Sequence, residues 1–243
     1  MGSPFDDYFT RMELHGTTKR EAVKTRAADY LTRRLPDSLS YKEVELGGRI
    51  VPLTVLSTED LDIKKVLSMP GETLPHGELA YWADNYWLIT EVDSDDELYA
   101  KGKMQQCNFL LKWKKENGDI VERWSIVEDG TKYLIGETSQ AMMTVGNARI
   151  AVTVGRDDET VNINRGMRFI IDDPDTSEPL AYQVTKPNKM FNVYNGKGII
   201  RFIMNEVSST ELDNMELRIA DYYSPTGKPI AGPPADAAGG VWI

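Results

Sequence analysis

Residues able to perform nucleophilic or acid–base chemistry are scarce in this chain. The sequence contains two histidines, His15 and His76, and a single cysteine, Cys107. A Ser–His–Asp or Cys–His site would have to use one of them. Both histidines stand in predicted turns or loops, which favours the surface, and Cys107 lies in an alternating pattern typical of a small buried residue. We therefore predict no catalytic residue, and the chain is not expected to be an enzyme.

Two acidic clusters invite a metal-binding interpretation. They comprise Glu91, Asp93, Asp95, Asp96 and Glu97, and further on Asp172, Asp173, Asp175 and Glu178. An EF-hand loop starting at Asp93 needs glycine and glutamate where this chain has Leu98 and Met104. The second cluster also lacks the spacing. Both are interpreted as solvated loop tips, and no metal and no cofactor are predicted. The run Gly196-Lys197-Gly198 lacks the other residues of a phosphate-binding loop.

The composition of the chain narrows its class. Its 243 residues include 28 basic and 38 acidic ones, for a net charge of −10. This balance argues against the whole chain coating nucleic acid or binding anionic membranes. Hydrophobic residues, at 41%, support a folded core. A lone cysteine excludes an internal disulfide framework, and no apolar run approaches the roughly 18 residues of a membrane span. These features predict a soluble protein made in a reducing cytoplasm, with no membrane partner.

Two short helices are predicted at the start of the chain. The first begins near Pro4, with an apolar stripe of Phe5, Tyr8, Phe9 and Met12. Thr18 and Glu21 form a capping box that opens the second helix, which Pro36 ends. The predicted buried face of this second helix consists of Val23, Ala27, Tyr30 and Leu31.

The second helix is also the basic part of an acidic protein. Residues 17–34 hold six basic residues against two acidic ones. Three interpretations stay open: a solvated helix face, a contact with an acidic partner protein, or a contact with a nucleic-acid backbone. The candidate interface residues here are Lys19, Arg20, Lys24, Arg26, Arg33 and Arg34.

From about residue 42 the hydrophobic period changes to two, which predicts strands. Hairpins are predicted at 43–55, with a turn at Gly47-Gly48, and at 77–92, with a turn at Asp84-Asn85. A long, bent strand is predicted at 98–114, and a turn at Asn117-Gly118 connects it to a strand at 120–124. Further strands are predicted at 132–135, 149–154, 159–163, 167–171, 180–185, 198–204 and 216–222. The fold class is therefore mainly β, built from small barrels or sandwiches.

A weak internal repeat divides the β region into two modules. Trp87-Leu88-Ile89-Thr90 parallels Tyr182-Gln183-Val184-Thr185, Gly77 parallels Gly166, and Arg49-Ile50 parallels Arg149-Ile150. Either a duplication or chance similarity between hairpins explains this. The predicted organisation is a helical arm at 1–41, a first β-module at 42–139, a second at 140–223 and an extended tail at 224–243.

The tail and the tryptophans supply the other candidate contacts. Residues 224–240 are dominated by Pro, Gly and Ala, and the chain closes with Val241, Trp242 and Ile243, predicted to anchor on a partner. The remaining tryptophans bracket two turns, as the pairs Trp82/Trp87 and Trp113/Trp124. Cross-strand packing, an aromatic groove for sugars, and burial in an interface are the three interpretations.

The first module resembles structural proteins of tailed bacteriophages and prophages of Gram-positive bacteria. The resemblance rests on Gly77 and Trp82, on Tyr86-Trp87-Leu88-Ile89-Thr90-Glu91-Val92-Asp93, and on the Gly102 strand with Met104-Gln105-Gln106-Cys107-Asn108 and Leu111-Lys112-Trp113. It covers about residues 5–136. The hairpin pattern is similar to the small β-barrel of head-tail joining and head-closure (neck) proteins.

This resemblance implies a non-enzymatic virion protein that is assembled in the host cytoplasm. The resemblance implies that copies of the chain assemble into a ring. The other implied partners are a portal or adaptor protein, a tail or capsid protein, and packaged DNA, which the ring would contact only in passing. A capsid decoration protein is the alternative, and a carbohydrate-binding module using the tryptophans is a third class. The second module and the long tail depart from the single small barrel common in head-closure proteins.

Overall fold

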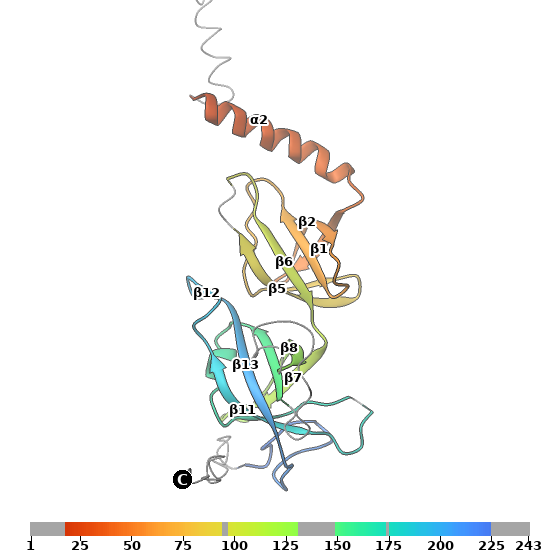
Figure 1. Cartoon of the computed structure of the whole chain (residues 1–243), viewed down its shortest axis with the longest axis vertical. Coiled ribbons are helices and arrows are strands. Elements are labelled where there is room, and N and C mark those ends of the chain that lie inside the picture. Colours follow the sequence, from red (N-terminus) through yellow and green to blue (C-terminus); the bar gives the residue numbers. More distant parts are fainter. Residues whose placement is uncertain (1–17, 94–96, 131–148, 174, 225–243) are drawn as a thin grey trace, which may run out of the picture. The chain divides into compact units, whose positions relative to one another are not determined.

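A computed structural model of the chain describes residues 18–93, 97–130, 149–173 and 175–224 (Figure 1). These residues form two compact units that divide between Gln106 and Cys107. The fold is mainly β, with two barrel-like sheets and one short helix at the N-terminal side, as predicted. The predicted helix near Pro4 lies outside the described residues.

Helix α2 (Lys19–Arg34) begins at the predicted capping box. The Thr18 hydroxyl oxygen accepts a hydrogen bond from the Glu21 backbone N–H at 3.2 Å, and the Glu21 carboxylate accepts one from the Thr18 N–H at 3.2 Å. A 3₁₀ turn, η1 (Leu35–Asp37), follows and contains Pro36. Both ends of the helix therefore follow from local sequence signals.

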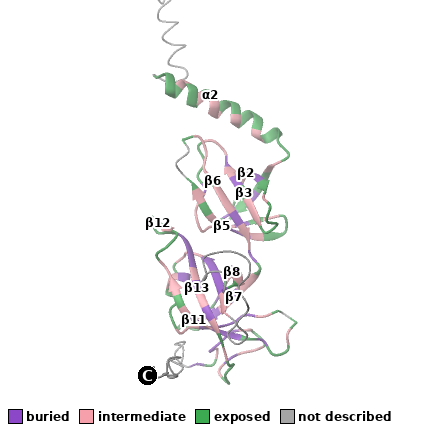
Figure 2. Cartoon of the chain, viewed as in Figure 1, coloured by how far each residue is buried: buried purple, intermediate pink, exposed green. Residues whose placement is uncertain are grey.

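The prediction that α2 buries one face is wrong. No residue of the helix is buried (Figure 2). Val23 and Tyr30 are 58% and 60% exposed. The physical reason is that the strands of the first unit enclose their own apolar core, to which α2 contributes no residue. The helix is therefore an arm beside a complete barrel.

The first unit is a closed six-stranded antiparallel barrel. Its strand order is β1-β2-β3-β6-β5-β4, and pairing of β4 with β1 closes it. Its strands are β1 (Tyr41–Leu46), β2 (Arg49–Ser57), β3 (Ile63–Ser68), β4 (Leu79–Trp82), β5 (Asn85–Asp93) and β6 (Lys101–Gln106). Alternate side chains point inward and form its core: Val44, Leu46, Leu53, Val66, Ala80, Trp87, Ile89 and Met104.

Two tight hairpins set the register of this barrel. Gly47 and Gly48, at φ +56° and +78°, make the predicted turn between β1 and β2. The turn between β4 and β5 is formed by Ala83 and Asp84, at φ +52° and +58°, one residue earlier than predicted. Both turns have two residues of positive φ, which matches the right-handed twist of the paired strands.

The second unit is a seven-stranded antiparallel sheet of order β10-β11-β13-β9-β8-β7, with β12 paired to β13. Its two terminal strands approach one another, and the rings of Trp113 in β7 and Phe169 in β10 meet edge to face at 6.1 Å. The sheet therefore curls around a buried core. Its strands are β7 (Phe109–Lys114), β8 (Ile120–Asp129), β9 (Arg149–Gly155), β10 (Arg168–Ile170), β11 (Ala181–Asn188), β12 (Val193–Tyr194) and β13 (Lys197–Val207).

The predicted boundary between the modules, at 139/140, needs correction. The long strand predicted at 98–114 is two strands in different sheets, because β6 pairs within the first barrel and β7 within the second. At the break, the Asn108 side chain donates to the Val127 carbonyl and accepts from its N–H, both at 2.8 Å. The second barrel therefore starts at Cys107 and takes β7 and β8 from the predicted first module.

Three other predicted strands also have definite outcomes. Residues 160–162 form a 3₁₀ turn, η2 (Thr160–Asn162), and not a strand. In the predicted strand at 216–222, only an isolated bridge between Asn214 and Ile219 forms. Residues 132–135 lie outside the described part of the chain.

The two barrels share one topology, which supports an internal duplication. Taken in chain order with β12 set aside, the strands of both units follow the order 1-2-3-6-5-4. The predicted match of Trp87–Thr90 with Tyr182–Thr185 joins the equivalent strands β5 and β11. The match of Arg49 with Arg149 fails, because it joins the second strand of one barrel to the third of the other.

The same irregularity recurs in both copies. Strand β5 bulges between Ile89 and Glu91, and β11 bulges between Val184 and Lys186. The bulged residues are Thr90 and Thr185, and each hydroxyl donates to a carbonyl of the last long strand, at 3.5 and 2.9 Å. A bulge at equivalent positions supports the duplication, because bulges are kept within families.

Candidate interaction surfaces

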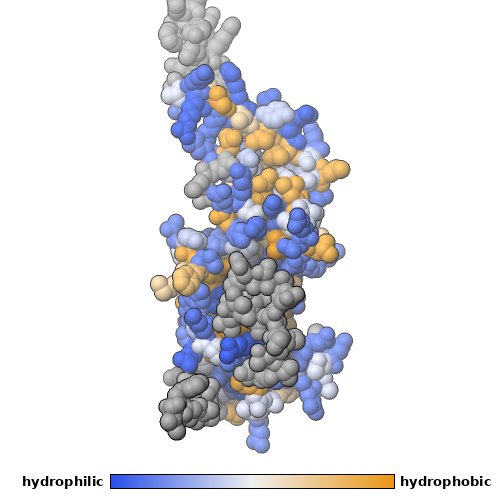
Figure 3. Space-filling model, in the orientation of Figure 1, coloured by the Kyte–Doolittle hydropathy of each residue, from blue (hydrophilic) through white to orange (hydrophobic). Residues whose placement is uncertain are grey.

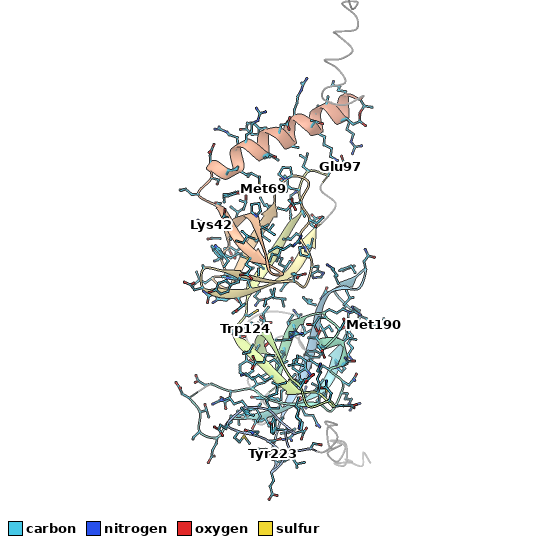
Figure 4. The ribbon with its side chains drawn as sticks, turned by 180° about the vertical axis from the view of Figure 1, so that it is seen from behind. Lys42, Met69, Glu97, Trp124, Met190 and Tyr223 are labelled. Carbon is cyan, nitrogen blue, oxygen red and sulfur yellow. The ribbon has the colours of Figure 1, made fainter. Side chains whose placement is uncertain are left out.

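All six predicted basic interface residues lie on α2, which follows directly from the span of the helix. Arg20 forms an ion pair with Glu97, and Lys24 Nζ lies 3.6 Å from the same carboxylate (Figure 4). The Arg34 guanidinium lies 5.9 Å from the centre of the Tyr30 ring. The side chains of both ion pairs are largely exposed, so each pair contributes little stability. Whether these residues bind a partner stays a prediction.

A shallow groove separates α2 from its own barrel. It has a volume of about 620 Å³, with Val23 and Ala27 on the helix side and Leu98 on the barrel side. Charged groups of both signs flank it, among them Lys24 and Glu97. The helix is thus attached to the barrel through exposed ion pairs and the connecting chain, while its apolar side chains stay accessible.

The C-terminal anchor prediction, Val241, Trp242 and Ile243, falls outside the described residues, as do His15 and part of the first acidic cluster. In the second cluster, Asp172 accepts hydrogen bonds from the N–H groups of Asp173 and Leu180, at 2.8 and 3.0 Å. Arg218 donates to three carbonyls of the same loop. Among the described residues, no group of three or more His, Cys, Asp or Glu side chains is placed to hold a metal ion.

The surroundings of His76 and Cys107 indicate structural roles for both side chains. The Nε2 atom of His76 lies 2.9 Å from the carbonyl oxygen of the bulged residue Thr90, so His76 is half-buried and not a free surface group. Cys107 is buried, as predicted, and burial raises the pKa of its thiol to about 12. A thiol with this pKa is almost fully protonated at neutral pH and is a poor nucleophile.

The tryptophans pack in the barrels. The rings of Trp82 and Trp87 lie 5.7 Å apart, and the Trp87 indole N–H donates to the Trp82 carbonyl at 3.1 Å. Trp113 packs on Phe169, with the ring centres 6.1 Å apart. Because Trp87 and Trp113 are buried, they offer no open face for stacking on a sugar ring. The cross-strand packing interpretation is confirmed for the first pair.

Sequence analysis missed a strongly exposed apolar feature in the described part of the second barrel. Residues 189–196, which we call the knob, project between β11 and β13 and include β12 (Figures 1 and 4). Met190, Phe191 and Tyr194 are 85%, 72% and 67% exposed. The sequence signal that could have marked this segment was its charge, because residues 179–205 contain four basic residues and no acidic one.

Sequence analysis also missed the buried Arg168. Its guanidinium contacts Asp213 and Asp221, which lie 45 and 53 residues away in the chain. These two carboxylates belong to the segment after β13, so the contact ties that segment to β10. No local pattern marks these three residues as partners.

The fold is that of a tandem β-barrel protein with exposed apolar side chains on α2 and on the knob. No family model and no curated protein matches the chain. A solved structure described as "MrkH, A novel c-di-GMP dependence transcription regulatory factor" is similar at 8% identity, covering 76% of this chain and 83% of that one, with a TM-score of 0.22. A likeness this weak carries no argument about this chain. None of the helices within the described residues has the length and apolar character needed to span a membrane.

Proposed function

We propose that this chain is a non-enzymatic structural component of a tailed-phage virion. In this proposal it belongs to the head-to-tail connection, where copies assemble as a ring and contact the portal or adaptor and the tail. It is made in the host cytoplasm and ends in the particle. The role depends on protein–protein contacts and needs no catalytic residue and no cofactor.

The observation that carries the proposal is α2, a capped helix that leaves its apolar face uncovered. Monomeric proteins rarely order a helix without burying any of its residues, because most helix stability comes from packing. Val23 and Tyr30 on this arm are more than half exposed. A second protein surface over the arm would bury them, as assembly proteins use terminal arms to do.

The phage resemblance maps onto residues that shape the first barrel. Gly77 has φ +81°, and its N–H donates to the Ile89 carbonyl at 2.9 Å. A Cβ atom on Gly102 would lie 2.5 Å from the Glu91 carbonyl oxygen and from Leu74 Cδ2. These residues thus shape a small barrel with a bulged β5, which agrees with the small β-barrel that the resemblance implies.

The negative charge of the first barrel is compatible with a position that lines the path of packaged DNA. Residues 41–106 carry thirteen acidic and six basic residues. Like-charge repulsion from phosphates would let DNA pass without adhering. This part of the proposal would be contradicted by salt-sensitive binding of duplex DNA to the isolated full chain.

Native mass spectrometry of the full chain, alone and with the candidate portal and capsid proteins, tests the role. We expect a ring or a stoichiometric complex with the portal. The double variant Arg26→Glu/Arg33→Glu should weaken that complex, whereas Lys42→Glu, an exposed charge on β1, should not. Binding to assembled capsid alone would favour the decoration role, and a monomer indifferent to both would contradict a virion role.

A further inference from the structure

The apolar stripe of α2, formed by Val23, Ala27 and Tyr30, is left largely open by the rest of the described chain. Val23 and Ala27 line the shallow groove of about 620 Å³ beside the barrel. In the view of Figure 3, hydrophobic residues reach the surface of the first unit among hydrophilic ones. A helix of 16 residues is marginal in water without packing, so the free chain gains stability if something covers this stripe.

The segment directly before α2 carries a matching stripe in its sequence. Phe5, Tyr8, Phe9 and Met12 recur at helical spacing within residues 1–17, which lie outside the described part of the chain. A helix over 4–14 is about 16 Å long and is too short to be stable alone in water. This segment therefore needs an apolar surface as much as α2 does.

The start of α2 favours a chain reversal over one continuous helix. Thr18 is extended, with φ −118° and ψ 156°, and its capping box with Glu21 closes the first turn of the helix. Gly16 stands two residues earlier, and glycine is the residue that most often ends a helix. Two helices joined by so short a connection become antiparallel neighbours.

An antiparallel pair brings the two stripes to the same level. Counted outward from the turn at 15–18, Phe9 falls near the level of Val23. Phe5 falls between the levels of Ala27 and Tyr30 in the same count. The four apolar side chains of the first segment thus cover the length of α2 that is open, and the segment needs no longer connection to reach it.

Charge favours the same pairing. Helix α2 has six basic and two acidic residues, whereas residues 1–17 have three acidic and one basic. Helical spacing places Asp6 and Glu13 on one edge of the stripe of the first segment. Arg20 and Lys24, which pair with Glu97, lie on one edge of the stripe of α2. In an antiparallel pair these two edges meet, so the carboxylates of the first segment approach basic side chains.

We infer that, in the free chain, the segment 4–14 packs antiparallel on α2 and covers its apolar stripe. The short tether gives the segment a high effective concentration at this surface. The contact also regulates the arm, and this regulation rests on the proposed function, in which a partner protein binds the same stripe. The partner has to displace the segment, and its apparent affinity is reduced to the fraction of chains in which the stripe is open.

Cysteine crosslinking in the free full-length chain tests the contact. In a Cys107→Ala background, Phe9→Cys/Val23→Cys is exposed to a mild oxidant and compared with Phe9→Cys/Thr25→Cys. Residue 25 lies about 200° around the helix from residue 23, so it is the control for mere proximity in the chain. We expect a fast disulfide within one chain for the first pair and a slow one for the control. Equal rates, no disulfide, or a disulfide only between chains would overturn the inference.

Binding to the candidate portal protein tests the regulation. Phe5→Ser/Phe9→Ser removes half of the covering stripe and should strengthen the complex, by about tenfold if nine chains in ten are covered. Leu14→Ser removes an apolar side chain on the other side of the predicted helix and should leave binding unchanged. Unchanged or weaker binding by the double variant would overturn the regulatory role.

The two experiments together separate this inference from the proposed function. A chain that forms the disulfide as expected but binds no candidate virion protein would overturn the proposed function alone. A chain that binds the portal without forming the disulfide would overturn the covering contact alone.

Discussion

Arg168 binds Asp213 through two parallel hydrogen bonds, buried between β10 and the segment that follows β13. Nη1 lies 2.9 Å from Oδ1, and Nη2 lies 2.8 Å from Oδ2. The two side chains are 6% and 0% exposed. Asp221 accepts a third bond from Nη1 at 2.8 Å. The network fixes the segment that follows β13, up to residue 224, against β10.

Removing this arginine should strongly destabilise the second barrel. Arg168→Met leaves two buried carboxylates without a cation, a defect that costs about 3–5 kcal/mol when one partner of a buried pair is lost. Chemical denaturation followed by fluorescence measures the change. Arg165→Ala, which removes an exposed arginine three residues earlier, is the control and should change stability little. Equal effects of the two substitutions would contradict the role given to Arg168.

The same network makes stability depend on acid pH. Burial of Asp213 acts to raise its pKa, but hydrogen bonds from Arg168 and from the N–H groups of Asp221 and Thr210 outweigh it and lower the pKa below the ordinary 3.8. The stability that Asp213 contributes is therefore complete above its ordinary pKa and is lost as pH falls through the lowered one.

Asp221 acts in the opposite direction. Burial raises its pKa, and the nearby Arg168 only partly offsets this. Near and above pH 4, Asp221 therefore takes up a proton more readily in the folded state than in the unfolded state. Its protonation thus favours folding as the pH falls. We expect Asp213→Asn to flatten the acid limb of the pH–stability curve below pH 4 and Asp221→Asn to leave that limb in place. An unchanged acid limb in Asp213→Asn would contradict this assignment.

The capping box should control α2 without affecting the barrels. Thr18→Ala removes the hydroxyl that accepts from the Glu21 N–H, at a cost of about 1 kcal/mol to the helix. Because α2 buries no residue, we expect a loss of helical circular dichroism with an unchanged unfolding midpoint. Thr32→Ala, whose hydroxyl bonds to the Ala28 carbonyl inside the helix, is the matched control. A lowered midpoint in Thr18→Ala would show that the arm is part of the barrel core.

The thiol of Cys107 should report on the integrity of the first residues of the second barrel. With a pKa near 12, it should react with an aromatic disulfide reagent at pH 8 far more slowly than an ordinary cysteine. Denaturant should restore the normal rate. A fast reaction in the native protein would mean that residues 107–108 open readily.

Sequence reasoning succeeded where the determinants are local. The capping box at Thr18 and the Gly47-Gly48 turn need only adjacent residues, and both form as predicted. The boundary at Gln106/Cys107 was missed because alternation continues through it and neither glycine nor proline marks the break. The exposed face of α2 was missed because amphipathic spacing tells which side chains share a face, but not whether anything covers it.

The knob and the Arg168 network could not be predicted for a related reason. Met190 and Phe191 are apolar residues next to a strand, and only the path of β11, β12 and β13 places them outside. Arg168 and Asp213 meet because β10 and the segment after β13 converge. The candidate interface residues on α2 are where they were expected, but their binding role is a matter for experiment.

The strand order of the second barrel has a consequence for its synthesis. Each barrel consists of contiguous chain, so the first can complete its pairing of β1 with β4 and of β5 with β6 while the second is still being translated. In the second barrel, β13 pairs with β9, β11 and β12, and it comes last in the chain among the strands of the described residues. That barrel therefore stays open until β13 has been translated, and the paired stem of the knob cannot form earlier.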